Sequence, residues 1–203
     1  MAEGSSNLMP IVSKIFCSPS LSTLVVRRRP HVINGGGFVV SDCNQKVAFS
    51  VDGCGILGTK GELVVRDSDG SLILLIHKKG GIIQAISTCS QWNGYTMNYE
   101  GAKDKVFSLS DSKPLFALRR STKIYIEPKR MNKDYYFEVI GSFPQRNCSI
   151  VTSKGIVAAQ VGFKEMNGSK DLYSLVVQPG FDQAFVVGVI AILDYLNGES
   201  TSC

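Results

Sequence analysis

The feature that most constrains this chain is an apolar run close to its C-terminus. No polar residue occurs from Ala184 to Leu193, so this segment has no face suited to water, whichever period it follows. A helix that is apolar on all sides belongs in a core or a membrane. The run is too short to cross a bilayer, which needs about 20 apolar residues. The sequence therefore predicts a helix buried inside structure that the preceding chain builds.

The flanking residues indicate where this helix begins and ends. Asp182 follows Pro179-Gly180 and is well placed as an N-cap, because its carboxylate can accept hydrogen bonds from the first free N–H groups. Asn197-Gly198 is a typical C-terminal stop. The β-branched residues in the run are also compatible with a buried strand. The span is long for a strand and ordinary for a helix, so we expect a core helix over residues 182–197.

The chain before this helix has the pattern of many short β-strands separated by turns. Apolar runs rich in β-branched residues recur at roughly 8–12 residues, which is typical of a β-sandwich or a β-barrel. An internal repeat supports this reading: Val39–Val47 aligns with Val64–Leu72, and Ile150–Val157 is a looser third copy. Each copy predicts a β-hairpin, and Gly70 supplies a turn residue that tolerates positive φ.

Length and composition predict one soluble domain. The chain has 203 residues, enough for a sizeable core. We expect a flexible arm over residues 1–20, a single domain over residues 21–198 and a disordered tail over residues 199–203. Because the first twenty residues lack the apolar stretch of a secretory signal, we expect a cytoplasmic protein, neither secreted nor spanning a membrane, with its six cysteines reduced. A monomer is the expected state.

No motif in the chain indicates catalysis. Residues 53–58 match the letters of the dinucleotide-binding motif GxGxxG, but a strand pattern follows them instead of a helix, so they are interpreted as a loop. Residues 67–70 lack the spacing of a calcium loop and are interpreted as a hairpin turn. His31 and His77 have no partner at metal-ligand spacing. We therefore expect neither an enzyme nor a cofactor or metal site.

Positive charge gathers at predicted strand ends and loops, and the net charge is +5. If several basic clusters converge in the fold, they can hold a phosphoinositide head group or an anionic membrane surface. If they do not, they provide solubility and block edge-to-edge pairing of strands. Nucleic acid is not expected, because no stacking aromatic motif accompanies them. The candidate binding residues are Arg27, Arg28, Arg29, Lys78, Lys79, Arg119, Arg120, Lys123, Lys129 and Arg130.

Several segments together resemble the plant LURP-one-related proteins. The resemblance covers residues 20–197 and rests on Gly35–Asp42, on Gly61–Asp67 with Gly70, on Trp92 and, above all, on Val176–Val186 with its Pro-Gly-Phe-Asp helix entry. It implies a Tubby C-terminal-like fold, which is a mainly β structure: a closed antiparallel β-barrel of about twelve strands around a central hydrophobic C-terminal helix. Phospholipid scramblases are similar in architecture. We expect structural roles for Gly70, Trp92, Pro179, Gly180 and Asp182.

The same resemblance bears on function. Tubby domains bind phosphoinositides, the founding LURP-one protein is tied to plant defence, and no enzymatic activity is established for the group. We therefore expect a non-enzymatic binding or adaptor module in plant defence signalling, which binds phosphoinositide or an anionic membrane surface and is peripheral at the plasma membrane. The alternative is a protein-interaction or transcriptional adaptor that does not bind lipid.

Overall fold

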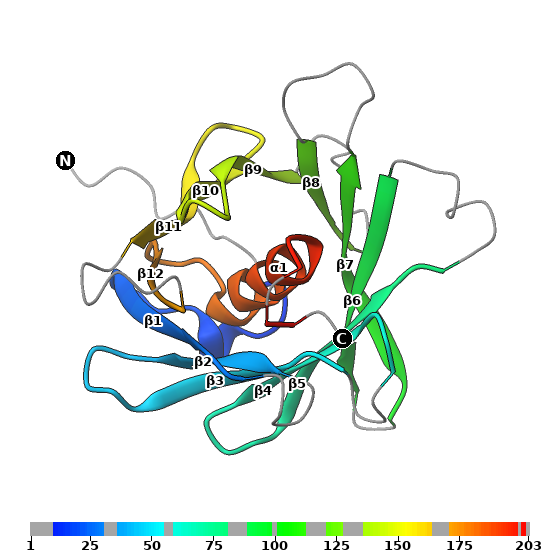
Figure 1. Ribbon diagram of the computed structural model, residues 1–203, viewed down its shortest axis with the longest axis horizontal. Coiled ribbons are helices and arrows are strands. Elements are labelled where there is room, and N and C mark those ends of the chain that lie inside the picture. Colours follow the sequence, from blue (N-terminus) through cyan, green and yellow to red (C-terminus); the bar gives the residue numbers. More distant parts are fainter. Residues whose placement is uncertain are drawn as a thin grey trace.

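A computed structural model places twelve antiparallel strands in one closed barrel, with an α-helix along its centre (Figure 1). This confirms the predicted barrel and its central helix. The structure describes residues 10–30, 36–54, 59–80, 89–98, 101–112, 121–127, 136–163, 171–198 and 200–201. The elements are the 3-10 helix η1 (Lys14–Phe16), the strands β1 (Ser22–Arg28), β2 (Gly37–Ser41), β3 (Val47–Asp52), β4 (Glu62–Asp67), β5 (Leu72–Lys78), β6 (Cys89–Met97), β7 (Lys103–Ser112), β8 (Ser121–Ile126), β9 (Tyr136–Ser142), β10 (Asn147–Thr152), β11 (Val157–Phe163) and β12 (Leu172–Val177), and the helix α1 (Gln183–Leu196).

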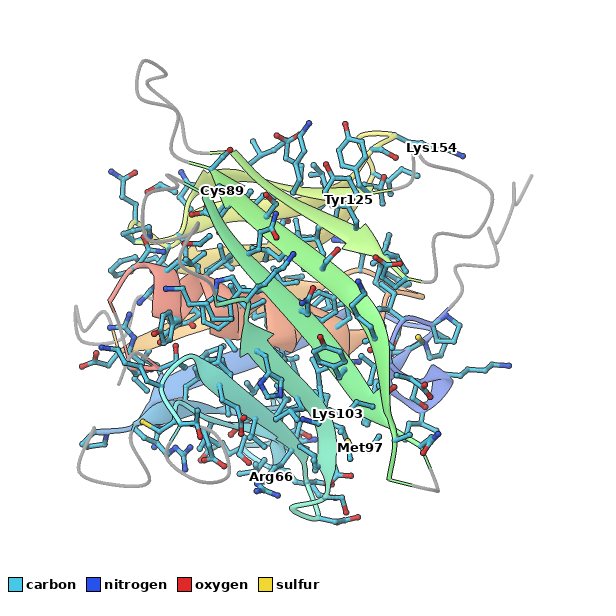
Figure 2. The ribbon with its side chains drawn as sticks, turned by 90° about the vertical axis from the view of Figure 1, so that its right-hand side faces the viewer. Arg66, Cys89, Met97, Lys103, Tyr125 and Lys154 are labelled. Carbon is cyan, nitrogen blue, oxygen red and sulfur yellow. The ribbon has the colours of Figure 1, made fainter. Side chains whose placement is uncertain are left out.

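The connections between strands alternate between two ends of the barrel. Each strand pairs antiparallel with the next one along the chain, and β1 closes the barrel by pairing with β12. We call the end with the β2–β3, β4–β5, β6–β7 and β10–β11 connections the turn end, and α1 begins there. The opposite end, with the β1–β2, β3–β4 and β5–β6 connections, is the loop end, and α1 finishes there. In Figure 2, Cys89 lies toward the loop end and Met97 toward the turn end.

The strands bury alternate residues, as expected for one face turned to a core. In β12, for example, Tyr173, Leu175 and Val177 are buried, and the residues between them are only partly covered. These inward side chains surround α1, in which residues 184–194 are all buried. At Gly188 the helix approaches β5 so closely that a Cβ would lie 2.5 Å from Leu74 Cδ2. The described part of the chain holds no helix with the length and apolarity to span a bilayer.

The internal repeat corresponds to hairpins of one design. Asp42 and Asp67 each accept two hydrogen bonds through Oδ1 from backbone N–H groups of their own turn, at 2.8–3.0 Å. The left-handed position that follows is filled by Gln45 (φ 65°) in the first copy and by Gly70 (φ 82°) in the second. Thr152 Oγ1 takes the carboxylate's place in the third copy, accepting from the N–H group of residue 156 at 3.1 Å. A register shift accompanies each of these turns.

The start of the helix is held as its sequence suggests. Pro179 and Gly180 form the centre of a tight turn in which Gly180 has a φ of 81°, a value that favours glycine. Asp182 is the N-cap, and its Oδ1 accepts a hydrogen bond from Phe185 N at 3.1 Å. The helix therefore occupies the predicted span.

Asp182 also binds the N-terminal segment, which the sequence led us to expect as a loose arm. Its Oδ2 accepts hydrogen bonds from three consecutive backbone N–H groups, those of Ile11, Val12 and Ser13, at 3.1, 2.7 and 3.0 Å. The Phe16 ring then packs on Phe49 with a centroid distance of 5.5 Å. Residues 10–20 thus lie against the turn end, whereas residues 1–9 are outside the described chain.

The C-terminal residues that the structure describes are also bound to the barrel, which differs from the expected disordered tail. Asp194 Oδ2 accepts hydrogen bonds from Ser200 Oγ at 3.0 Å and from Thr201 N at 2.7 Å. The Gly37 N–H donates to Ser200 O at 2.7 Å, so the segment is tied to β2 as well. Residues 199, 202 and 203 lie outside the description.

Of the five cysteines that the structure describes, one departs from the expectation of reduced thiols. Cys54 is in a disulfide, whereas Cys17, Cys43, Cys89 and Cys148 are free. Spacing along the chain could not reveal this, because proximity in the fold decides whether two cysteines pair.

Candidate functional site

The loop end of the barrel gathers most of the basic candidates that the structure describes. Arg27–Arg29 close β1, Lys78-Lys79 close β5, and Lys123 lies near the start of β8, so all three clusters belong to strand ends on this side. Four candidates lie outside the described residues: Arg119, Arg120, Lys129 and Arg130.

Arg28 serves as an internal counter-ion. Its Nη1 lies 3.4 Å from Asp171 Oδ1, and its Nε lies 3.4 Å from Asp194 Oδ1. The Asp194 side chain has no exposed surface. A buried carboxylate that loses its cation is strongly destabilising, so Arg28 is committed to the fold.

Arg29 has a similar structural role across the first strands. Its Nη2 donates to Val51 O and to Asp52 Oδ1, both at 2.6 Å. Asp52 Oδ2 accepts a longer bond from Arg66 Nε at 3.3 Å. These Arg29–Asp52–Arg66 contacts therefore link β1, β3 and β4. They engage the Arg29 guanidinium, which was one of the candidate ligand groups.

A further arginine at this end was not found by sequence reasoning. Arg146 is 2% exposed, and its guanidinium lies between the rings of Phe143 and Tyr173, at 4.7 and 4.2 Å from their centroids. Its Nη1 donates to Phe143 O at 3.1 Å. Burial lowers the pKa of Arg146 and raises the pKa of the Tyr173 hydroxyl. As an isolated basic residue in a turn, Arg146 carried no signal in the sequence that predicts burial.

The lysines at the loop end remain exposed to solvent. Lys60, Lys78 and Lys79 are exposed, and we call these three residues the basic rim. Gly61, which follows Lys60, lies against Lys78: the Lys78 N–H donates to Gly61 O at 2.7 Å, and a Cβ at Gly61 would lie 3.2 Å from Lys78 Cβ. Lys60 is therefore a neighbour of the consecutive residues Lys78 and Lys79. Within the described chain none of the three lysines forms an ion pair. Sequence reasoning missed Lys60, because in the sequence it is an isolated cation in a loop. Only the pairing of the strands brings it close to Lys78.

One lysine of the basic rim contacts an aromatic pair at the end of the helix. Lys78 Nζ lies 5.8 Å from the centroid of the Tyr195 ring. The Tyr195 ring meets Trp92 edge-on at 4.8 Å, and Trp92 is fully buried. Trp92 thus has a packing role, and Tyr195 is the aromatic surface beneath the lysine.

The other described candidates lie apart from the rim. Arg27 is exposed at the loop end, where its Cα partner is Leu172 on β12. Lys123 lies on the outer wall, with Nζ 5.1 Å from the Tyr136 ring centroid, and β6 and β7 separate its strand from β5. The structure therefore brings together Lys78 and Lys79 but not the whole predicted set.

Of the residues considered for catalysis, His77 is described, and it forms contacts on both sides of its ring. His77 Nδ1 lies 3.4 Å from Glu62 Oε2, and its Nε2 lies 3.4 Å from Lys103 Nζ, so neither ring nitrogen faces a nucleophile. Burial lowers the pKa of His77, and Glu62 opposes that shift. Across the described residues no group of three or more His, Cys, Asp or Glu is arranged to hold a metal ion. Residues 55–58 and His31 lie outside the description.

Comparison with known proteins agrees with this architecture. An X-ray structure of an Arabidopsis thaliana protein has the same fold, with a TM-score of 0.65 at 19% identity over 92% of this chain and 98% of that one. Protein LURP-one-related 6 of Arabidopsis thaliana is 56% identical over 95% of this chain and 98% of its own length. Protein LURP-one-related 16 of the same plant is 46% identical over 100% of this chain and 99% of its own.

The family model described as LURP-one-related matches residues 22–194. This match begins with the first residue of β1 and ends in the last turn of α1, so it includes every strand of the barrel. The chain belongs to the LURP-one-related family.

Proposed function

We propose that this protein is a non-catalytic binding module that docks on anionic membrane surfaces through its basic rim, with phosphoinositide head groups as the preferred ligands. The observation that carries the proposal is the exposure of Lys60, Lys78 and Lys79 side by side, without ion pairs in the described chain. A lysine close to an anionic bilayer contributes about 1 kcal/mol. Three such lysines supply about 3 kcal/mol, which suits weak, reversible and salt-sensitive recruitment.

The ion-paired arginines Arg28 and Arg29 are not part of this binding surface. Moving Arg28 toward a lipid phosphate would remove the cation beside the buried carboxylate of Asp194, and moving Arg29 would break its bonds to Val51 O and Asp52. For Asp194 the cost of an uncompensated buried charge is about 3–5 kcal/mol, more than a single phosphate contact at the surface returns. The rim lysines pay no such penalty, since they are already solvated.

The test is co-sedimentation with vesicles of neutral lipid, with and without phosphatidylinositol 4,5-bisphosphate, at low and at physiological salt. The Lys78→Glu/Lys79→Glu variant should bind phosphoinositide vesicles at least about 30-fold more weakly, because two contributions of about 1 kcal/mol are lost. Lys46→Glu/Lys154→Glu makes the same change of charge at exposed positions of the turn end and should bind as the wild type does. Equal loss in both variants, or binding that ignores phosphoinositide, would refute the proposal.

The cellular setting is part of the same proposal. We expect the protein at the cytoplasmic face of the plasma membrane in plant defence signalling, an expectation supported by the resemblance to the founding LURP-one protein. The rival function is a protein or transcriptional adaptor indifferent to lipid. It predicts that the Lys78→Glu/Lys79→Glu variant has the same subcellular distribution as the wild type in plant cells. Our proposal instead predicts that the variant is released from membranes into the soluble fraction.

A further inference from the structure

Exposed apolar side chains are concentrated at the turn end, opposite the basic rim. Of the seven large hydrophobic residues that are exposed in the described chain, Ile140 lies on the wall and Phe163 at the loop end. The other five form what we call the turn-end face: Ile15, Leu21, Val47, Met97 and Ile156. Soluble monomers scatter such residues over their surface, and five of seven around one end of the barrel make that end a candidate interaction surface.

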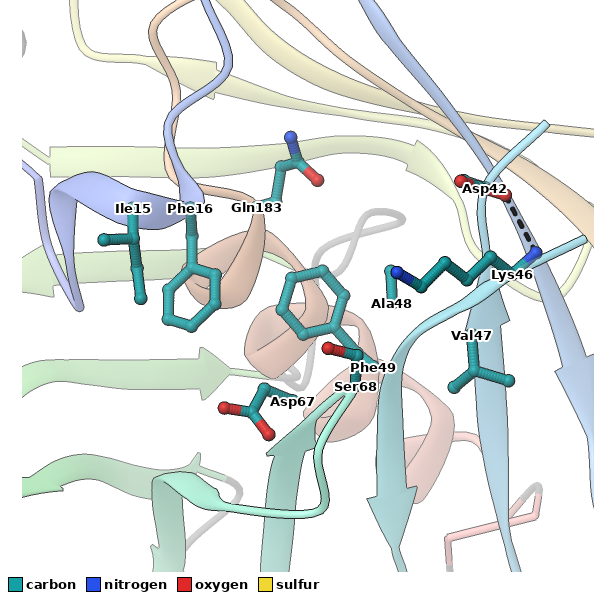
Figure 3. Close-up of a pocket in the computed structure, with 10 residues that line it drawn as sticks. All are labelled: Ile15, Phe16, Asp42, Lys46, Val47, Ala48, Phe49, Asp67, Ser68 and Gln183. Atoms are coloured by element: carbon teal, nitrogen blue, oxygen red, sulfur yellow. Dashed lines mark hydrogen bonds between the residues drawn. The ribbon is translucent and has the colours of Figure 1, made fainter. Parts of the chain in front are cut away.

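A pocket of about 290 Å³ opens within this face (Figure 3). Its floor contains the packed rings of Phe16 and Phe49, and its walls come from η1 and from the β2–β3 and β4–β5 turns. The volume is at the lower limit of sites for drug-sized ligands, so it suits one apolar side chain. Ile15 lines the pocket and is 81% exposed.

The charges around the pocket are of both signs. Lys14 and Lys46 are exposed beside it, as is Asp69 in the β4–β5 turn. Asp42 and Asp67 use Oδ1 to hold their own turns, and in the described chain their Oδ2 atoms make no hydrogen bond. Both carboxylates line the pocket and can receive a cation.

We propose that the turn-end face is a self-association surface, on which two copies of the chain meet about a twofold axis and Ile15 of each copy enters the pocket of the other. A twofold contact uses the same patch on both partners, so the patch must be complementary to itself. The turn-end face meets this requirement in shape, because a projecting isoleucine adjoins an apolar hollow. The face meets this requirement in charge as well, because it has both lysines and aspartates beside the pocket, so a lysine of one copy can face an aspartate of the other.

The same features make a bilayer a poorer occupant. The aspartates around the pocket offset its lysines, so the face has no excess of positive charge to attract anionic lipid. Protein partners, in contrast, fill hollows with side chains and pair mixed charges at the rim. A contact that centres on one isoleucine and one pocket in each copy is not the extensive apolar interface of a permanent dimer, so we expect an association that is weak and depends on concentration.

The direct test is analytical ultracentrifugation of the wild-type protein over a wide concentration range without lipid. We expect a monomer–dimer equilibrium, and Ile15→Asp should raise its dissociation constant at least about tenfold, because one isoleucine is withdrawn from each of two equivalent contacts. Ile15→Ala should give a smaller loss. Phe163→Asp is the matched control, an equally drastic change at an exposed residue of the loop end, and should leave the equilibrium unchanged.

The outcomes separate self-association from other uses of the face. A wild-type protein that stays monomeric at all concentrations overturns the proposal, and so does a dimer that Ile15→Asp leaves intact. If Ile15→Asp lowers vesicle binding without changing the sedimentation of the lipid-free protein, the face serves a bilayer and the proposal fails. Because the sedimentation test contains no lipid, its result is independent of the proposed membrane function.

A second readout does rest on that function. In a dimer joined at the turn ends, the two basic rims face away from each other. Such a dimer should cluster phosphoinositide vesicles, measured as turbidity, and Ile15→Asp should bind single vesicles normally without clustering them. Clustering that persists in Ile15→Asp would contradict the proposed geometry.

Discussion

Replacing the buried Asp182 with alanine should strongly destabilise the turn end of this barrel. Asp182 is 3% exposed, and its carboxylate accepts four backbone hydrogen bonds, one from Phe185 at the helix start and three from residues 11–13. Loss of an N-cap costs about 1 kcal/mol. Each bond to the charged oxygen contributes about 1.5–3 kcal/mol while it remains desolvated.

The total loss of stability is limited, because the N-terminal segment of residues 10–20 can detach and its N–H groups can then donate to water. Detachment then sacrifices the packing of Phe16 on Phe49, an aromatic pair whose geometry contributes about 0.5–1.5 kcal/mol beyond the buried area. We therefore expect a loss of about 3–5 kcal/mol in the free energy of unfolding. A domain of this size has about 5–15 kcal/mol in all, so the variant should still fold.

Guanidinium unfolding monitored by circular dichroism measures the loss, and amide hydrogen exchange at Ile11, Val12 and Ser13 locates it. These three amides should exchange much faster in Asp182→Ala, whereas those of the helix centre should change only with global stability. Asp69→Ala, which removes an exposed carboxylate from a turn at the same end, should cost less than about 0.5 kcal/mol. A loss below about 1 kcal/mol in Asp182→Ala, with protected arm amides, would refute the reasoning.

Two further predictions concern packing and thiol reactivity. Gly94→Ala places a Cβ 2.3 Å from the buried Phe107 ring and should lower the free energy of unfolding by about 1–3 kcal/mol, whereas a Cβ at Gly80 meets nothing within 4 Å, so Gly80→Ala should be neutral in the same assay. Burial raises the pKa of Cys148 to about 12, so in the native protein at mildly alkaline pH iodoacetamide should leave Cys148 unmodified while it alkylates the exposed Cys43, as read by peptide mass spectrometry. Rapid alkylation of Cys148 without unfolding would contradict its placement in the core.

The candidate site illustrates where sequence reasoning stops. The sequence shows which residues are cationic, and it correctly placed Lys78-Lys79 at a strand end. It could not show that Arg28 and Arg29 are neutralised, because their carboxylates on Asp194 and Asp52 are distant along the chain. It overlooked Lys60 for the same reason, since only the pairing of β4 with β5 makes it a neighbour of Lys78.

The two chain ends show a similar limit. Residues 10–20 have the polar, aperiodic composition of an arm, and composition carries no information about a single distant acceptor. Asp182 was recognised as an N-cap from its local context, but its second oxygen binds residues about 170 positions away. One carboxylate thus had a local role that could be predicted and a long-range role that could not.

What the sequence determined by itself is local. An apolar run with an N-cap and a C-terminal stop specifies α1, and polar turns with Asp or Thr and a left-handed residue specify the repeated hairpins, because both depend on residues within a few positions of one another. The tertiary structure decided everything that depends on closure: which strand ends share a side, which cations keep their charge for a ligand, and where exposed apolar residues gather. These follow from the pairing of β1 with β12 around the helix, since closing the barrel brings together residues that no spacing along the chain relates.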